Sequence, residues 1–402
     1  MHMRDKYPWV LVAGGFHRHG GMDKANMALA QYLTETNRLV HIVCHSIDSD
    51  LSRHPLITLH NVPRPGGSTF LGEPLLDIRA RSVARSVTKQ SPLATVVVNG
   101  GNCRWAGVNW VHSVHHAWHC VDSGAPSWFK VKNRISKGIA KKRELRALRM
   151  AHLVVANSER TRLDLIEHLA IPAKRVHVIY LGTDPSWCPP SDAERIQVRR
   201  RFEVRGDAPL IAFVGALSHD NNKGFDVLWS AWRALCARDD WDGFLVVAGG
   251  GSGVRRWMYE CGRAGLSHRV RFLGFTTQVP DVLKAADLLI SPVRYEAYGL
   301  NVHEAICHGV PAIVSASAGI AERYPVRLFP MLLQDVEDVP DLVTRILAWR
   351  ANRSHWQTLF LPLADELRRH TWRHMAEQIV SLVESVSIGE HLEGAPDTYW
   401  RH

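Results

Sequence analysis

The sequence has no cysteine pattern of the kind that binds zinc or cross-links a small secreted domain. Its 402 residues contain seven cysteines, an odd number. They are scattered along the chain as Cys44, Cys103, Cys120, Cys188, Cys236, Cys261 and Cys307. Neither close pairs with metal-ligand spacing nor a disulfide framework can be drawn from these positions. We therefore expect reduced thiols, most of them buried, and no metal site.

Long apolar runs are also absent. No stretch approaches the ~18 to 20 consecutive apolar residues that a membrane-spanning helix needs. The N-terminal segment MHMRDKYPWVLVAGG has neither the hydrophobic segment nor the cleavage site of a signal peptide. With 46% hydrophobic and 22% charged residues, the composition is typical of a soluble globular protein. We expect a cytoplasmic protein long enough for two domains with separate cores.

Acidic residues are too few to balance the basic ones, and the formal net charge is +10. Most of the excess lies in residues 130–149, where nine Lys or Arg residues accompany one Glu. The apolar residues Trp128, Val131, Ile135, Ile139, Leu145 and Leu148 fall roughly along one side of a helix. Such a helix suits an anionic membrane surface, here the inner face, or an acidic acceptor. A solvated surface helix is the alternative, and no nucleic-acid-reading motif accompanies the charge.

Strand patterns alternate with helical ones in both halves of the chain. In the first half they cover 9–15, 39–46, 94–101, 108–119 and 152–158, and we expect the last of these to close a first sheet. In the second half they cover 209–216, 243–252, 270–275, 287–293 and 310–316. This alternation predicts an α/β protein with two parallel sheets that bind ligands at their carboxyl ends.

A Pro-rich connection after a strand pattern near residue 175 marks the best domain boundary. We place a Rossmann-like first domain at 1–187 and a Rossmann-like second domain at 188–370. A C-terminal helix follows at 371–387. Residues 388–402 are expected to be a flexible tail.

Two glutamates stand out in SPVRYEAYGLNVHEAICHGVPAIVS, residues 291–315. If a helix begins near Tyr298 or Gly299, the amides of its first turn form an anion site beside Glu296, and diphosphate is the obvious anion. Glu304 could then reach neutral hydroxyl groups such as those of a ribose. The alternative is one solvated Glu in a loop and a second on the surface.

Other motifs are weaker. Gly20 and Gly21 open a helix after the first strand, but they match no phosphate-loop pattern. Asp48–Asp50 are expected to form a loop and not a metal site. The four histidines at 112, 115, 116 and 119 have no HExxH pattern or cysteine partner that would favour a metal.

Several segments together resemble the retaining GT-B glycosyltransferases of family four (glycosyl transferases group 1). The two glutamates, separated by seven residues and with Gly299 three residues after the first, are followed by GVPAIVSASAG. VGALSHDNNKGFDVLWSAW, VVAGGGS, VRFLGF and HLVVANSERTRLDLIEHL are similar as well. The resemblance implies two Rossmann-like domains whose parallel sheets face a central cleft, with the C-terminal helix crossing back to the first domain.

The implied reaction moves a sugar from a nucleoside diphosphate to an acceptor hydroxyl, with retention of the anomeric configuration. No cofactor is implied beyond the nucleotide-sugar donor, and the acceptor would be a glycan, a lipid-linked molecule or a small molecule. Glycan or glycolipid assembly is the implied setting.

The resemblance also implies roles for single residues. Lys223 would contact the leaving diphosphate, Glu296 the donor sugar and Glu304 the ribose. Further donor contacts would come from Tyr298, Gly299, Leu300, Gly274, Phe275 and Gly215. Gly20 and Gly21 would face the acceptor and the donor phosphates. Either His115 or His116 would lie beside the transferred sugar.

One position departs from the family pattern. The family usually has an Arg after the Gly of VG, but this chain has Ala216. Arg294, His219 or a residue of the first domain could substitute for that cation. Two alternatives therefore stay open: a catalytically silent GT-B binding or scaffold subunit, and a GT-B sugar phosphorylase or isomerase.

Overall fold

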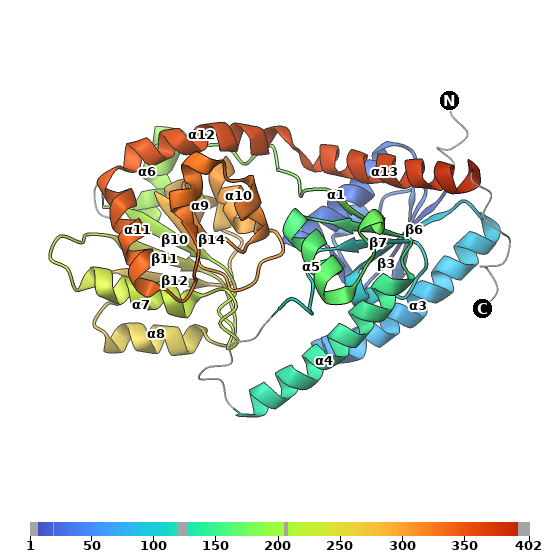
Figure 1. The fold of residues 1–402 in the computed structure, drawn as a ribbon, viewed down its shortest axis with the longest axis horizontal. Helices are drawn as coiled ribbons and strands as arrows, with labels where there is room; N and C mark the ends of the chain where they lie inside the picture. The colour runs from blue at the N-terminus through green and yellow to red at the C-terminus, as the bar shows by residue number, and fades with distance from the viewer. Residues whose placement is uncertain (1–6, 19, 119–126, 205–207, 393–402) are drawn as a thin grey trace.

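The computed structural model of the chain describes residues 7–18, 20–118, 127–204 and 208–392. These residues form two α/β units, each built around a parallel sheet with helices packed around it (Figure 1). The predicted α/β class is confirmed. Cys120 and His119 lie outside the described residues.

The first unit contains a seven-stranded sheet in the order β5-β3-β1-β6-β7-β8-β9, with all neighbours parallel. Its strands are β1 (Trp9–Val12), β3 (Val40–Cys44), β5 (Ile57–Asn61), β6 (Thr95–Asn99), β7 (Val108–Val111), β8 (Leu153–Ala156) and β9 (Val176–Val178). A separate pair joins β2 (Gly15–Phe16) to β4 (Ser46–Ile47). The helices are α1 (Gly21–Glu35), α2 (Ser49–Ser52), α3 (Thr69–Gln90), α4 (Ser127–Met150) and α5 (Glu159–Leu169).

Two predictions for this unit were wrong. Residues 152–158 do not close the sheet, because β9 pairs with β8, for example Val154 with Val176, and forms the edge. The sequence does indicate a strand near residue 175, but a local pattern does not show which sheet that strand joins. Asp48–Asp50 do not form only a loop, because Ser49 begins the one-turn helix α2 and Asp48 is its N-cap.

The second unit contains a six-stranded parallel sheet in the order β12-β11-β10-β13-β14-β15. Its strands are β10 (Leu210–Val214), β11 (Phe244–Ala248), β12 (Val270–Gly274), β13 (Leu288–Ser291), β14 (Ala312–Ser315) and β15 (Leu332–Leu333). Its helices are α6 (Asp192–Arg201), α7 (Phe225–Cys236), α8 (Val254–Arg263), α9 (Val279–Ala285), α10 (Leu300–Cys307), α11 (Val339–Ala351) and α12 (Arg353–Arg369). The central strands β10, β11, β13 and β14 are almost wholly buried, as expected when helices cover both faces of a sheet.

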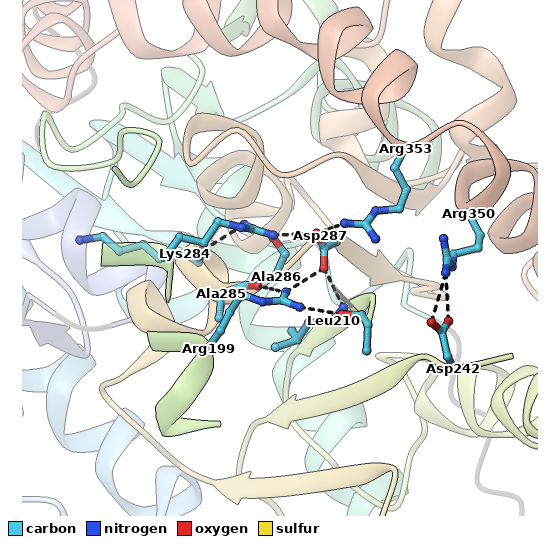
Figure 2. A network of polar contacts seen from close by, with 11 residues as sticks. Arg199, Leu210, Asp242, Lys284, Ala285, Ala286, Asp287, Arg350 and Arg353 are labelled. Atoms are coloured by element: carbon cyan, nitrogen blue, oxygen red, sulfur yellow. Dashed lines mark hydrogen bonds and ion pairs between the residues drawn. The ribbon is translucent and has the colours of Figure 1, made fainter. Parts of the chain in front are cut away.

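A buried carboxylate ties the helices of the second unit to its sheet. Asp287, which is 2% exposed, accepts hydrogen bonds from Arg195, Arg199 and Arg353 and from the backbone amide of Leu210. Figure 2 shows this network at the point where β10 and β13 begin. It holds α6 and α12 at the amino ends of these strands, the edge opposite the carboxyl ends where parallel sheets bind ligands.

The chain crosses between the units twice, and the two crossings touch. Thr183, on the outward path, pairs with Thr371 on the return path. A Cβ on Gly182 would lie 2.4 Å from backbone atoms of Trp372, so only glycine allows this approach. The helix α13 (Trp372–Leu392) then runs back along the first unit and packs on α1 (Figure 1). Arg38 forms an ion pair with Glu384 there, at 2.8 Å.

The return of the C-terminal helix to the first unit agrees with the expectation, but its predicted end was wrong. α13 continues to Leu392, so the first residues of the expected tail 388–402 are helical. Residues 393–402 lie outside the described residues.

The basic segment 130–149 lies within the long helix α4, as predicted. Leu148 is fully buried near the end of α4, whereas Trp128, Val131 and Ile135 at its beginning are 57% to 65% exposed. The predicted apolar stripe therefore packs on the protein at one end and faces outward at the other. No helix in the described part of the chain is long and apolar enough to cross a bilayer.

The six described cysteines are free thiols, and four of them are buried: Cys44, Cys103, Cys261 and Cys307. Their burial agrees with the expectation of mostly buried cysteines.

Candidate active site

The carboxyl ends of the two sheets meet where the units join. The amide of Val114, after β7, donates to the hydroxyl of Tyr295, after β13, at 2.7 Å. The hydroxyl of Ser158, after β8, donates to the carbonyl of Ala297. Because parallel sheets bind ligands at these ends, the candidate site is this junction.

The helix α10 begins where the sequence predicts it. Gly299 is its N-cap, with φ of 109°, and Leu300 is its first residue. The amides of a first helical turn have no intrahelical partner, so they face the loop that carries Glu296. The side chain of Tyr298 is buried, and its hydroxyl is bonded to Nδ1 of His303 at 2.7 Å. Only the backbone of Tyr298 therefore remains for a ligand.

Lys223 and Glu296 lie together. The Lys223 ammonium donates to the Glu296 carboxylate, and these side chains are 27% and 20% exposed. Gly224 makes the approach possible, because it has φ of +68° and a Cβ there would lie 1.7 Å from the carbonyl oxygen of Pro292. A cation and a carboxylate thus flank the start of α10.

Glu304 is buried, with 7% of its surface exposed. Burial raises the pKa of its carboxyl, while the nearby charge of Lys24 lowers it and that of Asp184 raises it further. Its carboxylate has no hydrogen-bond partner among the residues that the structure describes. Burial disfavours the charged form of this carboxylate, so the side chain fits a ligand that supplies hydroxyl donors.

The first unit reaches the same place through its glycine loop. Gly20, with φ of +85°, is the N-cap of α1. A Cβ on Gly21 would lie 3.2 Å from the Leu300 side chain. The loop predicted to face the acceptor and the phosphates therefore lies against the first residue of α10. Lys24, one turn further along α1, lies over the Trp187 ring at 4.7 Å.

His115 and His116 share one carboxylate. Nδ1 of His115 is 3.0 Å from Oε1 of Glu144, and Nδ1 of His116 is 2.7 Å from Oε2. Glu144 comes from the basic helix α4 and is 1% exposed. The loop of these histidines is joined to Tyr295, the residue before Glu296, through Val114.

His112 belongs to the core and not to the site. Burial of its ring lowers the pKa of its imidazole to about 3, both ring nitrogens are shielded from solvent, and the ring packs on Trp110 with centroids 4.5 Å apart. Among the described residues, no group of three or more His, Cys, Asp or Glu side chains is arranged to hold a metal ion.

The remaining predicted donor residues lie at neighbouring strand ends. A Cβ on Gly215, after β10, would contact the Lys223 side chain at 3.3 Å. Gly274 ends β12 with φ of +66°, and its carbonyl accepts from the Gly249 amide at 2.9 Å. Phe275 is 84% exposed beside Gly250. Gly274 and Phe275 thus border the site on the far side of β11 without contacting the Glu pair.

Arg294 does not replace the arginine missing at position 216. Its guanidinium is bonded to both carboxylate oxygens of Asp226 and of Glu337, and 7% of its side chain is exposed. His219 remains near the site, with its ring 5.2 Å from that of Phe129 at the start of α4.

Glu144, Tyr295 and Gly224 were not identified from the sequence. Glu144 is the one acidic residue in the basic segment 130–149, and that singularity was the available signal. The roles of Tyr295 and Gly224 depend on contacts between segments far apart in the sequence, which no local pattern indicates.

A cavity of about 430 Å³ lies apart from these residues. It is lined by Tyr180, Arg323, Glu366, His370 and others near the two crossings, and by none of the predicted site residues. We place the site by the polar side chains at the strand ends, because the reactive groups converge there.

The chain has two α/β units, each with a parallel sheet, and a cation, two carboxylates and the N-terminus of a helix lie where the units join. This arrangement is typical of the GT-B class of proteins. The family model for glycosyltransferase family 4 matches residues 19–187, and that for glycosyl transferases group 1 matches residues 208–351. Together these matches cover most of the chain. The chain belongs to the family four glycosyltransferases, glycosyl transferases group 1, as its sequence predicted.

Among curated relatives, mannosylfructose-phosphate synthase of Agrobacterium fabrum is 29% identical over 66% of this chain and 59% of its own length. D-inositol 3-phosphate glycosyltransferase of Salinispora tropica is 37% identical over 42% of this chain and 38% of its own. The chain thus spans about two fifths to three fifths of the length of these relatives.

Solved structures share the fold over nearly the whole chain. Sucrose-phosphate synthase of Thermosynechococcus elongatus has a TM-score of 0.74 at 18% identity, covering 95% of this chain and all of its own. HepE of Anabaena in complex with UDP-glucose has a TM-score of 0.68 at 17% identity, covering 94% of this chain and 99% of its own. The predicted GT-B architecture is confirmed.

Proposed function

We propose that this chain is a retaining glycosyltransferase that moves a sugar from a nucleoside diphosphate to an acceptor hydroxyl. The observation that carries the proposal is the convergence at the junction of Lys223, Glu296 and the partnerless, buried Glu304 around the start of α10. Family membership supports both the transferase activity and retention. The complexes of HepE with UDP and UDP-glucose support a nucleotide-sugar donor.

Each group has a role that its position suits. Lys223 and the amides at Gly299 and Leu300 stabilise the negative charge that develops on the departing diphosphate, and they do so without reorganising. Glu304 accepts hydrogen bonds from the ribose hydroxyls. Glu296, held by Lys223, accepts hydrogen bonds from hydroxyls of the transferred sugar. The departing phosphate takes the proton of the acceptor, so no side chain has to act as a covalent nucleophile.

No cofactor or metal enters this mechanism. Lys223 and the helix start supply positive charge where other enzymes use a cation.

The acceptor side is assigned to the first unit. Its loop at Gly20 and Gly21 borders the start of α10. We further propose that the beginning of α4 rests on an anionic membrane surface. Trp128, Val131 and Ile135 are exposed among exposed cations, a combination that favours a membrane interface. A glycan or a lipid-linked acceptor would be presented at that surface.

A catalytically silent binding subunit is the second candidate. Ala216 stands where the family usually has an arginine, and Arg294 cannot replace that arginine because it is bonded to Asp226 and Glu337. Thermal shift with a panel of UDP-, GDP- and ADP-sugars, followed by assay of donor hydrolysis, separates the two. An enzyme is stabilised by one donor and cleaves it, even slowly with water as acceptor. Stabilisation without cleavage would favour the silent subunit. Formation of sugar phosphate only when inorganic phosphate is added would favour a phosphorylase.

A further inference from the structure

Both carboxylate oxygens of Glu144 are hydrogen-bonded to His115 and His116 in the loop after β7. Oε1 accepts from the backbone amide of His115 at 2.8 Å and contacts Nδ1 of its ring at 3.0 Å. Oε2 accepts from the amide of His116 at 3.3 Å and contacts Nδ1 of its ring at 2.7 Å. Both oxygens of one buried side chain therefore hold two successive residues by backbone and ring together.

The charge state of Glu144 determines which nitrogen of each histidine ring carries the hydrogen. Burial raises the pKa of the Glu144 carboxyl, but hydrogen bonds and charge from His115, with those from His116, outweigh burial and leave the pKa below its usual value. An ionised carboxylate only accepts hydrogen bonds, so each Nδ1 must carry a hydrogen. In a neutral imidazole the other nitrogen, Nε2, is then an acceptor.

The Nε2 atoms of both histidines remain available to a ligand. In the part of the chain that the structure describes, no hydrogen bond reaches Nε2 of His115 or of His116. The two side chains are 36% and 22% exposed. Their loop is held at the junction by the bond from Val114 to Tyr295, the neighbour of Glu296. A pair of oriented acceptor nitrogens thus lies beside the residues assigned to the donor.

We propose that Glu144 is a positioning residue that locks His115 and His116 as Nδ1–H tautomers, so that their Nε2 atoms accept hydrogen bonds from sugar hydroxyl groups. This inference rests on the proposed glycosyl transfer for the identity of the ligand. The hydroxyls can belong to the donor sugar or to the acceptor. The assignment gives a reason for the one acidic residue in the basic segment 130–149 of α4, because the charge of Glu144 faces inward, toward the histidines.

The variant Glu144→Gln tests whether Glu144 sets the tautomers of His115 and His116. An amide has one acceptor oxygen and one donor NH₂ group, so it cannot accept from both rings. The ring that meets the NH₂ group must turn its Nδ1 into an acceptor and carry its hydrogen on Nε2. Nitrogen NMR of ¹⁵N-histidine-labelled full-length protein distinguishes these tautomers. We expect two Nδ1–H rings in the wild type at pH 8 and one of them changed in Glu144→Gln.

Arg143→Gln is the matched control. Arg143 precedes Glu144 and pairs with Glu73 of α3, so this variant disturbs α4 without touching the histidines. It should keep the wild-type tautomers. His115→Asn and His116→Asn assign the signals and keep a side-chain N–H donor for Glu144, while they lack Nε2. If Glu144→Gln unfolds, the wild-type spectrum still decides, because an Nε2–H ring at either position overturns the proposal.

Activity tests the second half of the inference. Removing a carboxylate that orients a metal-binding histidine costs about 10- to 100-fold. We expect Glu144→Gln to lose kcat in that range, while the KM for the donor that the wild type consumes changes less than about twofold. The same loss in hydrolysis and in transfer assigns the Nε2 contact to the donor sugar, and a loss confined to transfer assigns it to the acceptor. Wild-type turnover in both His→Asn variants would overturn the proposal. If the wild type cleaves no donor, the proposed function fails, while the tautomer measurement still tests Glu144.

Discussion

Replacing Glu304 by Gln should produce two effects of opposite sign. In the free protein the Glu304 carboxylate is buried without a hydrogen-bond partner among the described residues, and burial raises its pKa. A neutral amide of the same shape removes a buried charge. Glu304→Gln should therefore raise the Tm of the free protein at pH 8. It should also weaken binding of UDP, because a neutral amide is a poorer acceptor for ribose hydroxyls.

The size of the second effect follows from the weaker hydrogen bond. A hydrogen bond to a charged group contributes about 1.5–3 kcal/mol and one to a neutral group about 0.5–1.5 kcal/mol, so the amide loses about 1–1.5 kcal/mol. Since each ~1.4 kcal/mol is a tenfold change, the Kd of UDP should rise by about 5- to 10-fold. Lys24 lies close enough to affect the pKa of Glu304, so part of the loss can reflect its changed position.

The pH dependence of stability has a definite sign. A carboxyl with a raised pKa binds its proton more tightly in the folded state, so it lowers stability as the pH rises from the unfolded value, ~4.3, through the folded value. The Tm advantage of Glu304→Gln should be full at pH 8 and shrink as the pH approaches the unfolded value. UDP affinity of the wild type should fall as the pH falls through the raised pKa, since protonated Glu304 is a weaker acceptor. Glu304→Gln should lack this pH dependence.

Calorimetry with UDP and thermal unfolding of the same samples measure both effects. Glu260→Gln on α8, a carboxyl with no assigned role, is the control and should match the wild type. A variant that binds UDP as tightly as the wild type would refute the assignment of Glu304 to the ribose. A lowered Tm in the free protein would refute the claim that burial disfavours the charge of Glu304 there.

Three further predictions concern the other charged groups. Lys223→Met should weaken UDP binding at least about tenfold by the loss of a charge-assisted contact, measured by calorimetry, with unchanged affinity removing Lys223 from the phosphate site. Glu296→Gln should cut turnover and leave UDP affinity equal or higher, because Lys223 loses its carboxylate partner; a clear drop in affinity would contradict the separate roles of the two glutamates. Replacing the exposed cations Lys130, Lys132, Arg134 and Lys142 by Gln should reduce sedimentation with anionic vesicles at low salt without changing UDP affinity, and equal sedimentation would make the exposed face of α4 an ordinary solvated surface.

The sequence was not sufficient to choose the cations for this vesicle test. The cations of the basic segment, for example Lys137, Lys141, Lys142 and Arg143, look equivalent in the sequence. In the structure Lys137 lies over the Trp118 ring at 3.9 Å, and Arg143 pairs with Glu73. Both are turned toward the protein, so they are poor choices for testing a membrane surface.

The parts predicted correctly depend on local patterns. Buried strands rich in valine and isoleucine follow from runs such as TVVVN in β6, and the start of α10 follows from Gly299 after a strand. The pairing of Lys223 with Glu296 was not predicted. Their side chains meet because Gly224 lets its loop pack on Pro292, a contact between segments about seventy residues apart.

Arg294 illustrates the same limit. In the sequence it stands two residues before Glu296 and could replace the arginine missing at 216. Its partners Asp226 and Glu337 come from distant segments, and they bury it. Only tertiary contacts show that it belongs to the scaffold of the site.

The most direct test of the central claim is proton NMR of the wild type and Lys223→Met incubated with UDP-, GDP- and ADP-sugars and water or an acceptor. The account predicts that the wild type consumes at least one donor, that the first product keeps the anomeric configuration of that donor, and that Lys223→Met loses this turnover. An inverted product, equal turnover by the variant, or no consumption of any donor would contradict it.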